Sequence, residues 1–182
     1  LSSSSAASDV YKRQVFNGKA VVFEGPEDYH KRLNDKKLKI DENSILIVRG
    51  CGPVGYPGAA EVVNMQPPDR LLKKGIRHLP TLGDGRQSGT SESPSILHVS
   101  PESAVGGDLG LVKTGDKMKI DLNKRRVDLL ISKAEFAKRR KNRKVFKFIN
   151  QTPWQEIFRN TVGQLEDGAC INSRGQYLDV SH

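Results

Sequence analysis

The most constraining feature of the sequence is the shortness of its apolar runs. From residue 15 onward, β-branched runs of five or six residues alternate with glycine and proline, as at 19–23 and 44–49. This pattern predicts short strands joined by turns. No apolar run approaches the roughly 20 residues that a membrane span needs, so we expect the body of the chain to be soluble.

Further elements follow from local signals. Proline followed by acidic residues predicts a short helix at 26–34, and a helical segment that ends on glycine predicts one at 69–75. Ser132 and Glu135 form a capping box that predicts another. The expected helices span 26–34, 69–75, the basic stretch after 132, and a last segment at 154–159. The other expected strands span 76–82, 109–111, 117–122 and 126–131.

These elements do not show the steady strand–helix alternation of a nucleotide-binding sheet. No internal repeat is visible in the 182 residues, and the length suits one domain with an appendage. We therefore expect the α/β class, as a compact mixed β-barrel-like domain flanked by short helices.

Charge and cysteine content bear on partners and compartment. The net charge of +9 comes largely from basic runs at 36–39 and 138–144, which lack interleaved aromatic residues. Solvated helix faces explain these runs better than nucleic-acid binding, which stays as a rival function. Cys51 and Cys170 form no C-x-x-C pair, so we expect reduced thiols in the cytoplasm. From the apolar runs and the charge pattern we expect neither a membrane nor a nucleic acid as partner.

The first 14 residues read differently from the rest. They have no amphipathic period and lack the apolar core of a signal peptide. The stretch 9–14 resembles the translation of a transposon adaptor used in sequencing libraries, and the alternative is a disordered natural N-terminus. We expect residues 1–14 to be a non-native disordered tail, with the native part beginning near Val15 and its upstream portion missing.

Two glycine-rich loops are the candidates for chemistry. They cover residues 49–61 and 83–90, and each follows a predicted strand. Many glycines let backbone amides approach an anionic ligand closely. Neither loop matches a phosphate-binding loop or a dinucleotide fingerprint, so ligand binding and structural turns both remain open on the residues alone.

Three ordered stretches carry a family resemblance. They are Gly52-Pro53-Val54-Gly55-Tyr56-Pro57-Gly58 with Glu61, Asp84-Gly85-Arg86-Gln87-Ser88-Gly89-Thr90, and His98-Val99-Ser100-Pro101-Glu102-Ser103-Ala104-Val105-Gly106-Gly107. Together they resemble the C-terminal domain of the dihydroxy-acid and 6-phosphogluconate dehydratases, which implies a swivelling β/β/α domain. The resemblance covers 15–145, and 146–182 is expected to be a C-terminal helical extension.

The resemblance implies a reaction and a division of roles. Family enzymes remove water from a 2,3-dihydroxy acid, using an iron–sulfur cluster, Mg²⁺ and an ionised serine as base. Carried onto this sequence, Ser88 is the base, Glu61 a magnesium ligand, and Thr90 and Arg86 substrate contacts. An ordinary turn serine, a surface carboxylate and structural roles for Thr90 and Arg86 are the alternatives. His98 is expected to be a core residue, and His182 is a weaker candidate for reaching the site.

The cofactor ligands are expected elsewhere. A [2Fe–2S] cluster needs several thiolates or equivalents, and neither cysteine matches a family ligand position. The cluster ligands and the remaining Mg²⁺ ligands are therefore assigned to a missing N-terminal domain, which makes this chain an inactive fragment of a homodimer or homotetramer.

The loop sequence also bears on the substrate. Ser88-Gly89-Thr90 resembles the arabonate and xylonate dehydratases, although residues 91–95 depart from the usual glycine-containing continuation. A small sugar acid is the expected substrate. The alternatives are dihydroxy-acid dehydration in branched-chain amino-acid synthesis, a non-catalytic docking domain, and the basic nucleic-acid-binding domain.

Overall fold

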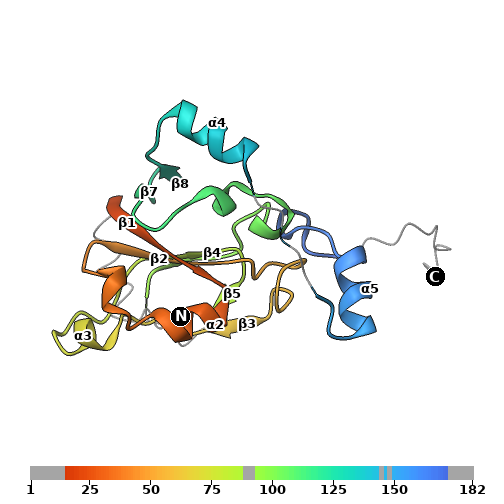
Figure 1. Ribbon diagram of the computed structural model, residues 1–182, viewed down its shortest axis with the longest axis horizontal. Helices are drawn as coiled ribbons and strands as arrows, with labels where there is room; N and C mark the ends of the chain where they lie inside the picture. The colour runs from red at the N-terminus through yellow and green to blue at the C-terminus, as the bar shows by residue number, and fades with distance from the viewer. Residues whose placement is uncertain (1–14, 88–92, 144–145, 147–148, 172–182) are drawn as a thin grey trace.

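The computed structural model describes residues 15–87, 93–143, 146 and 149–171. A mixed six-stranded sheet with the order β6-β4-β2-β1-β7-β8 forms its centre and curls into a half-barrel (Figure 1). The strands of this sheet are β1 (Val15–Glu24), β2 (Ser44–Arg49), β4 (Thr81–Gly83), β6 (Ser95–Ile96), β7 (Lys117–Asp121) and β8 (Arg126–Leu129). The expected mixed α/β, barrel-like class is confirmed.

Strand β1 pairs in parallel with one neighbouring strand and antiparallel with the other. Its second half, from Lys19 to Glu24, runs parallel to β2, and its first half pairs antiparallel with β7. The strand is therefore longer than the apolar run that predicted it. The sequence does not predict the first half because Asn17 and Gly18 interrupt the apolar pattern, and only pairing with β7 makes them strand residues.

The core lies on both faces of β1 and β2. Successive side chains of a strand point to opposite faces, so Val21 and Phe23 enter one cluster while Ala20 and Val22 enter the other. All four are at most 6% exposed. This two-sided burial explains why these strands are continuously apolar rather than alternating.

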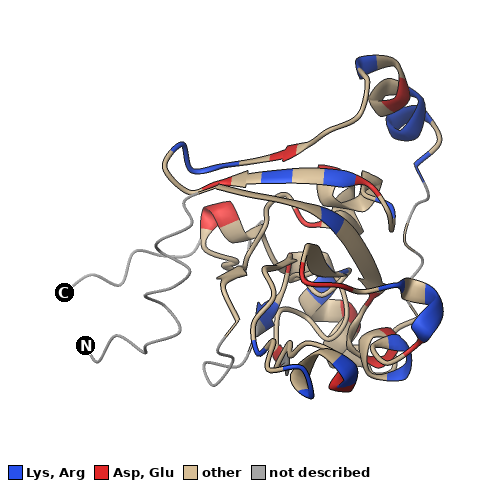
Figure 2. Ribbon diagram, turned by 90° about the vertical axis from the view of Figure 1, so that its left-hand side faces the viewer, with Lys and Arg blue, Asp and Glu red and all other residues tan. Residues whose placement is uncertain are grey.

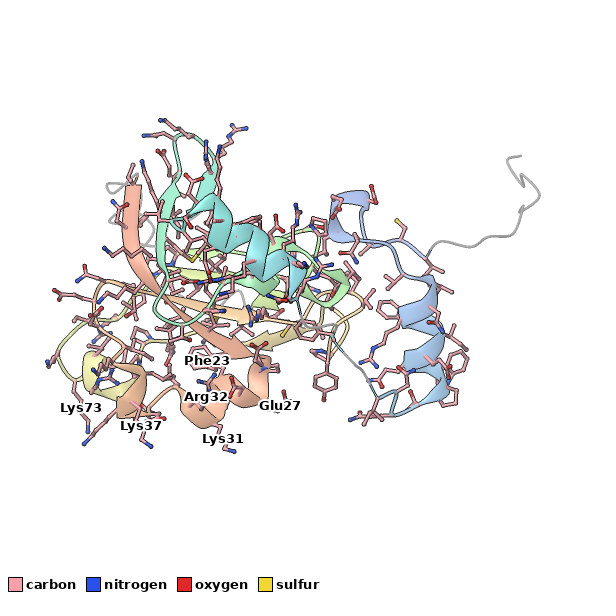
Figure 3. All side chains as sticks on the ribbon, turned by 45° about the horizontal axis from the view of Figure 1, so that its top comes forward. Phe23, Glu27, Lys31, Arg32, Lys37 and Lys73 are labelled. Carbon is pink, nitrogen blue, oxygen red and sulfur yellow. The ribbon has the colours of Figure 1, made fainter. Side chains whose placement is uncertain are left out.

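The helices of the described residues are all short. They are α2 (Pro26–Arg32), α3 (Asp69–Leu72), α4 (Lys133–Lys141) and α5 (Pro153–Thr161), with 3₁₀ turns η1 (Lys36–Leu38), η2 (Ser103–Val105), η3 (Asp108–Leu111) and η4 (Leu165–Asp167). Helix α2 is anchored by Arg32, whose guanidinium lies 5.2 Å from the Phe23 ring (Figure 3) and donates to the Val22 carbonyl. None of the helices in the described part of the chain has the length and apolarity to cross a membrane.

The predicted cap at Ser132 is present. Its hydroxyl accepts the Glu135 amide at 3.1 Å and begins α4. Lys and Arg gather on this helix (Figure 2), and none of its residues is buried. The expected solvated basic face needs one correction, because the Arg139 side chain is only 11% exposed and pairs with Asp116 and Glu135.

Two strand predictions were wrong. Residues 108–111 form the 3₁₀ turn η3, in which the Gly110 amide donates to Gly107 and the Val112 amide to Leu109. Local turn hydrogen bonds thus replace sheet pairing at the predicted 109–111 strand. The predicted strand 76–82 is reduced to β4, which begins after Pro80, a residue with no amide to donate to a sheet.

Candidate functional site

The candidate site is built around the segment that follows β2, residues 50–60, here called the glycine loop. A buried carboxylate, Asp84, fixes where this loop begins. Asp84 Oδ1 accepts the Cys51 amide at 3.0 Å, and Oδ2 accepts the Gly50 amide at 3.1 Å and the Ser103 amide at 2.9 Å. The Ser103 hydroxyl also donates to Asp84 and accepts from the Gly50 amide. One side chain therefore holds together the ends of β2 and β4 and the start of η2.

A second buried carboxylate holds the middle of the glycine loop. Glu102 accepts the Val54 amide at 2.8 Å and the Gly55 amide at 2.9 Å, and the Gln164 side-chain amide also donates to it, at 2.8 Å. Burial raises the pKa of the Glu102 carboxyl, although these three hydrogen bonds oppose the rise. The loop is thus shaped by acceptors placed under its amides rather than by regular secondary structure.

Close backbone packing explains two of the glycines. A Cβ on Gly85 would lie 2.7 Å from Cβ of Cys51, and one on Gly55 would lie 2.3 Å from the Gly50 carbonyl oxygen. No side chain fits at either position. The two glycine-rich loops predicted from the sequence are therefore in direct contact at their bases.

Glu61 and Arg86 are brought together by a small second sheet. Strands β3 (Glu61–Val63) and β5 (Arg86–Gln87) pair in parallel, with Glu61 opposite Arg86. The Arg86 guanidinium lies 3.8 Å from the Glu61 carboxylate, and both side chains are about half exposed, at 54% and 45%. Two of the four predicted site residues are thus neighbours at an accessible position.

The other predicted residues have different outcomes. Ser88, Thr90 and His182 lie outside the described residues, as does the predicted tail at 1–14. His98 is exposed and has a positive φ of 57° just after β6, so its expected place in the core was wrong. The strand-like run around it ends two residues earlier, and His98 turns the chain instead.

The two cysteines differ in environment. Cys51 is buried at the base of the glycine loop, and burial, with nearby Asp84, raises the pKa of its thiol to about 12. A protonated, enclosed thiol does not suit a cluster ligand. Cys170 is exposed. Within the described residues, no group of three His, Cys, Asp or Glu side chains is close enough to hold a metal ion.

Asp84 and Glu102 were missed as site-forming residues. Asp84 lies in the second glycine-rich loop and Glu102 in the 98–107 stretch of the family resemblance, but the sequence patterns give neither residue a role. In the sequence each is a single acidic residue among small or apolar residues, and the structure buries both carboxylates completely. A carboxylate in such a place must find donors, and the nearby glycine loop supplies them.

Helix α5 supports the outer part of the glycine loop. Gly58 sits against the Phe158 ring, whose edge carbon would lie 3.3 Å from a Cβ at that position. Gln164, just beyond the helix, reaches Glu102 with both its oxygen and its nitrogen. The candidate site therefore combines β2, β4, η2 and the α5 region.

Sequence comparison identifies the family of this chain. The family described as dihydroxy-acid/6-phosphogluconate dehydratase C-terminal matches residues 3–169. The chain belongs to this family. The match contains the glycine loop, Glu61, Arg86 and both buried carboxylates, so the elements that form the site are family elements.

Individual relatives include sugar-acid dehydratases. The chain is 55% identical to D-xylonate dehydratase of Caulobacter vibrioides over 92% of its own length and 28% of that protein. It is 50% identical to L-arabinonate dehydratase of Rhizobium leguminosarum bv. trifolii over 69% of its length and 22% of that protein. A dihydroxy-acid dehydratase of Thermodesulfovibrio yellowstonii is 41% identical over 88% of this chain. The chain spans less than a third of the length of these relatives.

Proposed function

We propose that this chain is the C-terminal part of a dehydratase that converts a 2,3-dihydroxy sugar acid to a 2-keto-3-deoxy acid. The observation that carries the proposal is that relatives named for sugar acids reach 55% and 50% identity to this chain. A third such relative, L-arabonate dehydratase of Azospirillum brasilense, is 40% identical, and a dihydroxy-acid dehydratase is 41% identical. Dihydroxy-acid dehydration in amino-acid synthesis is therefore the second candidate within the same chemistry.

The proposed reaction is redox-neutral. A base removes the proton on carbon 2, the electrons of that C–H bond form the C2=C3 double bond, and the 3-hydroxyl leaves as water after taking a proton. The resulting enol becomes the 2-keto acid. We assign the base to an ionised Ser88 hydroxyl, which needs nearby positive charge because a free serine is far too weakly acidic at neutral pH. Thr90 is assigned to substrate binding.

Glu61 and Arg86 suit complementary tasks. A half-exposed ion pair contributes little to stability, so either partner can exchange the other for a ligand at low cost. Arg86 can then pair with the substrate carboxylate, for which a guanidinium has matching geometry. Glu61 can turn its carboxylate oxygens to a divalent cation.

The described residues fit Mg²⁺ in part, and the two cysteines do not fit a [2Fe–2S] cluster. Glu61 offers one hard oxygen ligand for Mg²⁺, which when bound would supply positive charge to the substrate carboxylate and 2-hydroxyl. Neither the buried, protonated Cys51 thiol nor the isolated Cys170 suits a [2Fe–2S] cluster. The cluster ligands and the remaining Mg²⁺ ligands are therefore assigned to a separate N-terminal domain of the complete enzyme, a homodimer or homotetramer in the cytoplasm.

A chimaeric enzyme tests the function. In the chimaera, this chain replaces the homologous C-terminal stretch of Caulobacter vibrioides D-xylonate dehydratase. Formation of 2-keto acid is measured with D-xylonate, L-arabinonate and 2,3-dihydroxy-isovalerate. We expect turnover of at least one sugar acid at a higher kcat/KM than dihydroxy-isovalerate. Turnover of dihydroxy-isovalerate alone, or of none of the three, would contradict the proposal.

Glu61→Gln in the chimaera tests the cation assignment. The amide loses the charge that attracts Mg²⁺, so the Mg²⁺ concentration needed for half-maximal turnover should rise at least about tenfold, as expected for loss of roughly 1.4 kcal/mol of binding. The matched control is Glu42→Gln, an exposed carboxylate in the turn before β2. An unchanged Mg²⁺ titration for Glu61→Gln would remove Glu61 from the metal site.

A further inference from the structure

Helix α5 carries an apolar face that the described residues leave uncovered. Trp154 is 79% exposed and Ile157 is 54% exposed, and no residue of the helix is buried. Ile149 before the helix and Ile171 after it are 89% and 65% exposed. Trp154 is the chain's single tryptophan. Trp154 and Ile157 are three positions apart and share one face of the helix, and large exposed apolar side chains on one face are typical of a protein interface rather than of a free surface.

The helix is held in place despite this exposure. Phe158 packs on Gly58, and Gln164 is bonded to Glu102 by its side-chain amide and carbonyl. Val162, at the end of the helix, is buried. Thr152 caps the first turn by accepting the Gln155 amide at 3.2 Å. Trp154 and Ile157 therefore face outward from a formed, anchored helix.

Resting on the proposed function, we propose that the Trp154–Ile157 face of α5 is where the cluster-bearing portion of the dehydratase docks onto this domain. The relatives extend far beyond the matched stretch, which covers only 28% and 22% of the two sugar-acid enzymes. That larger portion must meet the candidate site, because this chain lacks suitable cluster ligands. Helix α5 borders the glycine loop through Phe158, so a partner that covers the outer face of the helix lies beside the candidate site.

Location and charge separate α5 from α4 as docking elements. Helix α5 lies at the edge of the fold, on the side of the glycine loop and away from the six-stranded sheet (Figure 1). Helix α4 has the same length of nine residues but carries mainly charged side chains. An apolar, aromatic face surrounded by polar residues supplies the anchor of a stable interface, whereas a basic face does not. This makes α4 an internal control.

Hydrogen–deuterium exchange compares the same residues in two contexts. Peptides that cover α5 and α4 are followed in the 182-residue chain and in the chimaera. We expect exchange across Pro153–Thr161 to slow by roughly tenfold or more in the chimaera, because an interface suppresses local opening. Exchange across α4 should change by less than about twofold. Equal α5 exchange in the two contexts would overturn the proposal.

A double variant supplies the second readout. Trp154→Ala with Ile157→Ser removes the exposed apolar atoms, and the thermal midpoint of the isolated chain should stay near that of the wild type. In the chimaera, the variant should lose the α5 protection and lower turnover at least about tenfold. The control variant, Lys138→Ala with Lys141→Ala on α4, should keep the α5 protection and the turnover of the unaltered chimaera. Full turnover and protection in the double variant would refute the docking surface.

The outcomes also separate docking from function and from self-association. Strong α5 protection in a chimaera that dehydrates none of the acids would support docking and refute the proposed function. Turnover without α5 protection would support the proposed function and refute the docking surface. The occupant would instead be a second copy if the isolated chain sediments as a dimer that Trp154→Ala dissociates, and that result would overturn our assignment.

Discussion

Replacement of Asp84 gives a direct measure of how the glycine loop is held. In Asp84→Ala, the Gly50 amide keeps the Ser103 hydroxyl as an acceptor at 2.9 Å, whereas the Cys51 amide and the amide and hydroxyl of Ser103 lose theirs. Each unsatisfied buried donor costs about 1–3 kcal/mol. We therefore expect the free energy of unfolding to fall by at least about 3 kcal/mol.

Asp84→Asn should be milder. The amide oxygen can remain at the Oδ2 position and keep the Gly50 and Ser103 donors, while its NH₂ group faces the Cys51 amide. One buried amide is then unsatisfied, which costs about 1–3 kcal/mol. The structure thus predicts an ordered series in which alanine is worse than asparagine.

Urea denaturation followed by far-UV circular dichroism measures this series. Fluorescence would report less well, because the single tryptophan lies exposed on α5. The control is Asp128→Asn on β8, whose carboxylate pairs with the exposed Arg126, and we expect a change within about 0.5 kcal/mol. An Asp84→Ala variant as stable as this control would refute the role assigned to Asp84.

Three further predictions follow from local environments. In the folded chain, a thiol reagent at pH 8 should modify exposed Cys170 rapidly and Cys51 only upon unfolding, because burial raises the pKa of Cys51 to about 12; two equally fast thiols would contradict this. Gly107→Ala should destabilise the chain by more than about 3 kcal/mol in urea denaturation, since its Cβ would lie 1.6 Å from the Pro101 carbonyl oxygen. Asp28 has its pKa lowered below 3.8, chiefly by a hydrogen bond from a nearby arginine, so its stabilisation is present above about pH 4 and is lost as pH falls through the lowered value. Asp28→Asn should therefore reduce stability by about 0.5–1 kcal/mol at pH 7 and by progressively less as the pH falls below about 4, and a pH-independent difference would argue against the ion pair.

The sequence was most informative where local chemistry decides structure. The apolar run at 44–49 is β2 from its first to its last residue, and the capping serine at 132 begins α4. Proline at the start of α2 also marks the helix as expected. In these places the periodicity or the cap acts through neighbouring residues, so no knowledge of distant contacts is needed.

The predictions fail where contacts between residues far apart in the sequence determine the structure. Leu109 and Leu111 resemble a strand, yet Gly107 packs so closely on Pro101 that the chain turns there. The sequence predicts the glycine loop but not its dependence on Asp84 and Glu102. Asp84 is 34 residues from the Gly50 amide, and Glu102 is 47 residues from the Gly55 amide. Contacts over such separations leave no local pattern in a single sequence.

The central claim is that this domain supplies the base for dehydration, and one variant tests it most directly. Ser88→Ala in the chimaera, assayed with the sugar acid that the unaltered chimaera dehydrates, removes only a hydroxyl. We predict the loss of 2-keto acid formation while the visible absorbance of the cluster is retained, which shows that the protein is still assembled. Turnover at the level of the unaltered chimaera would contradict the account.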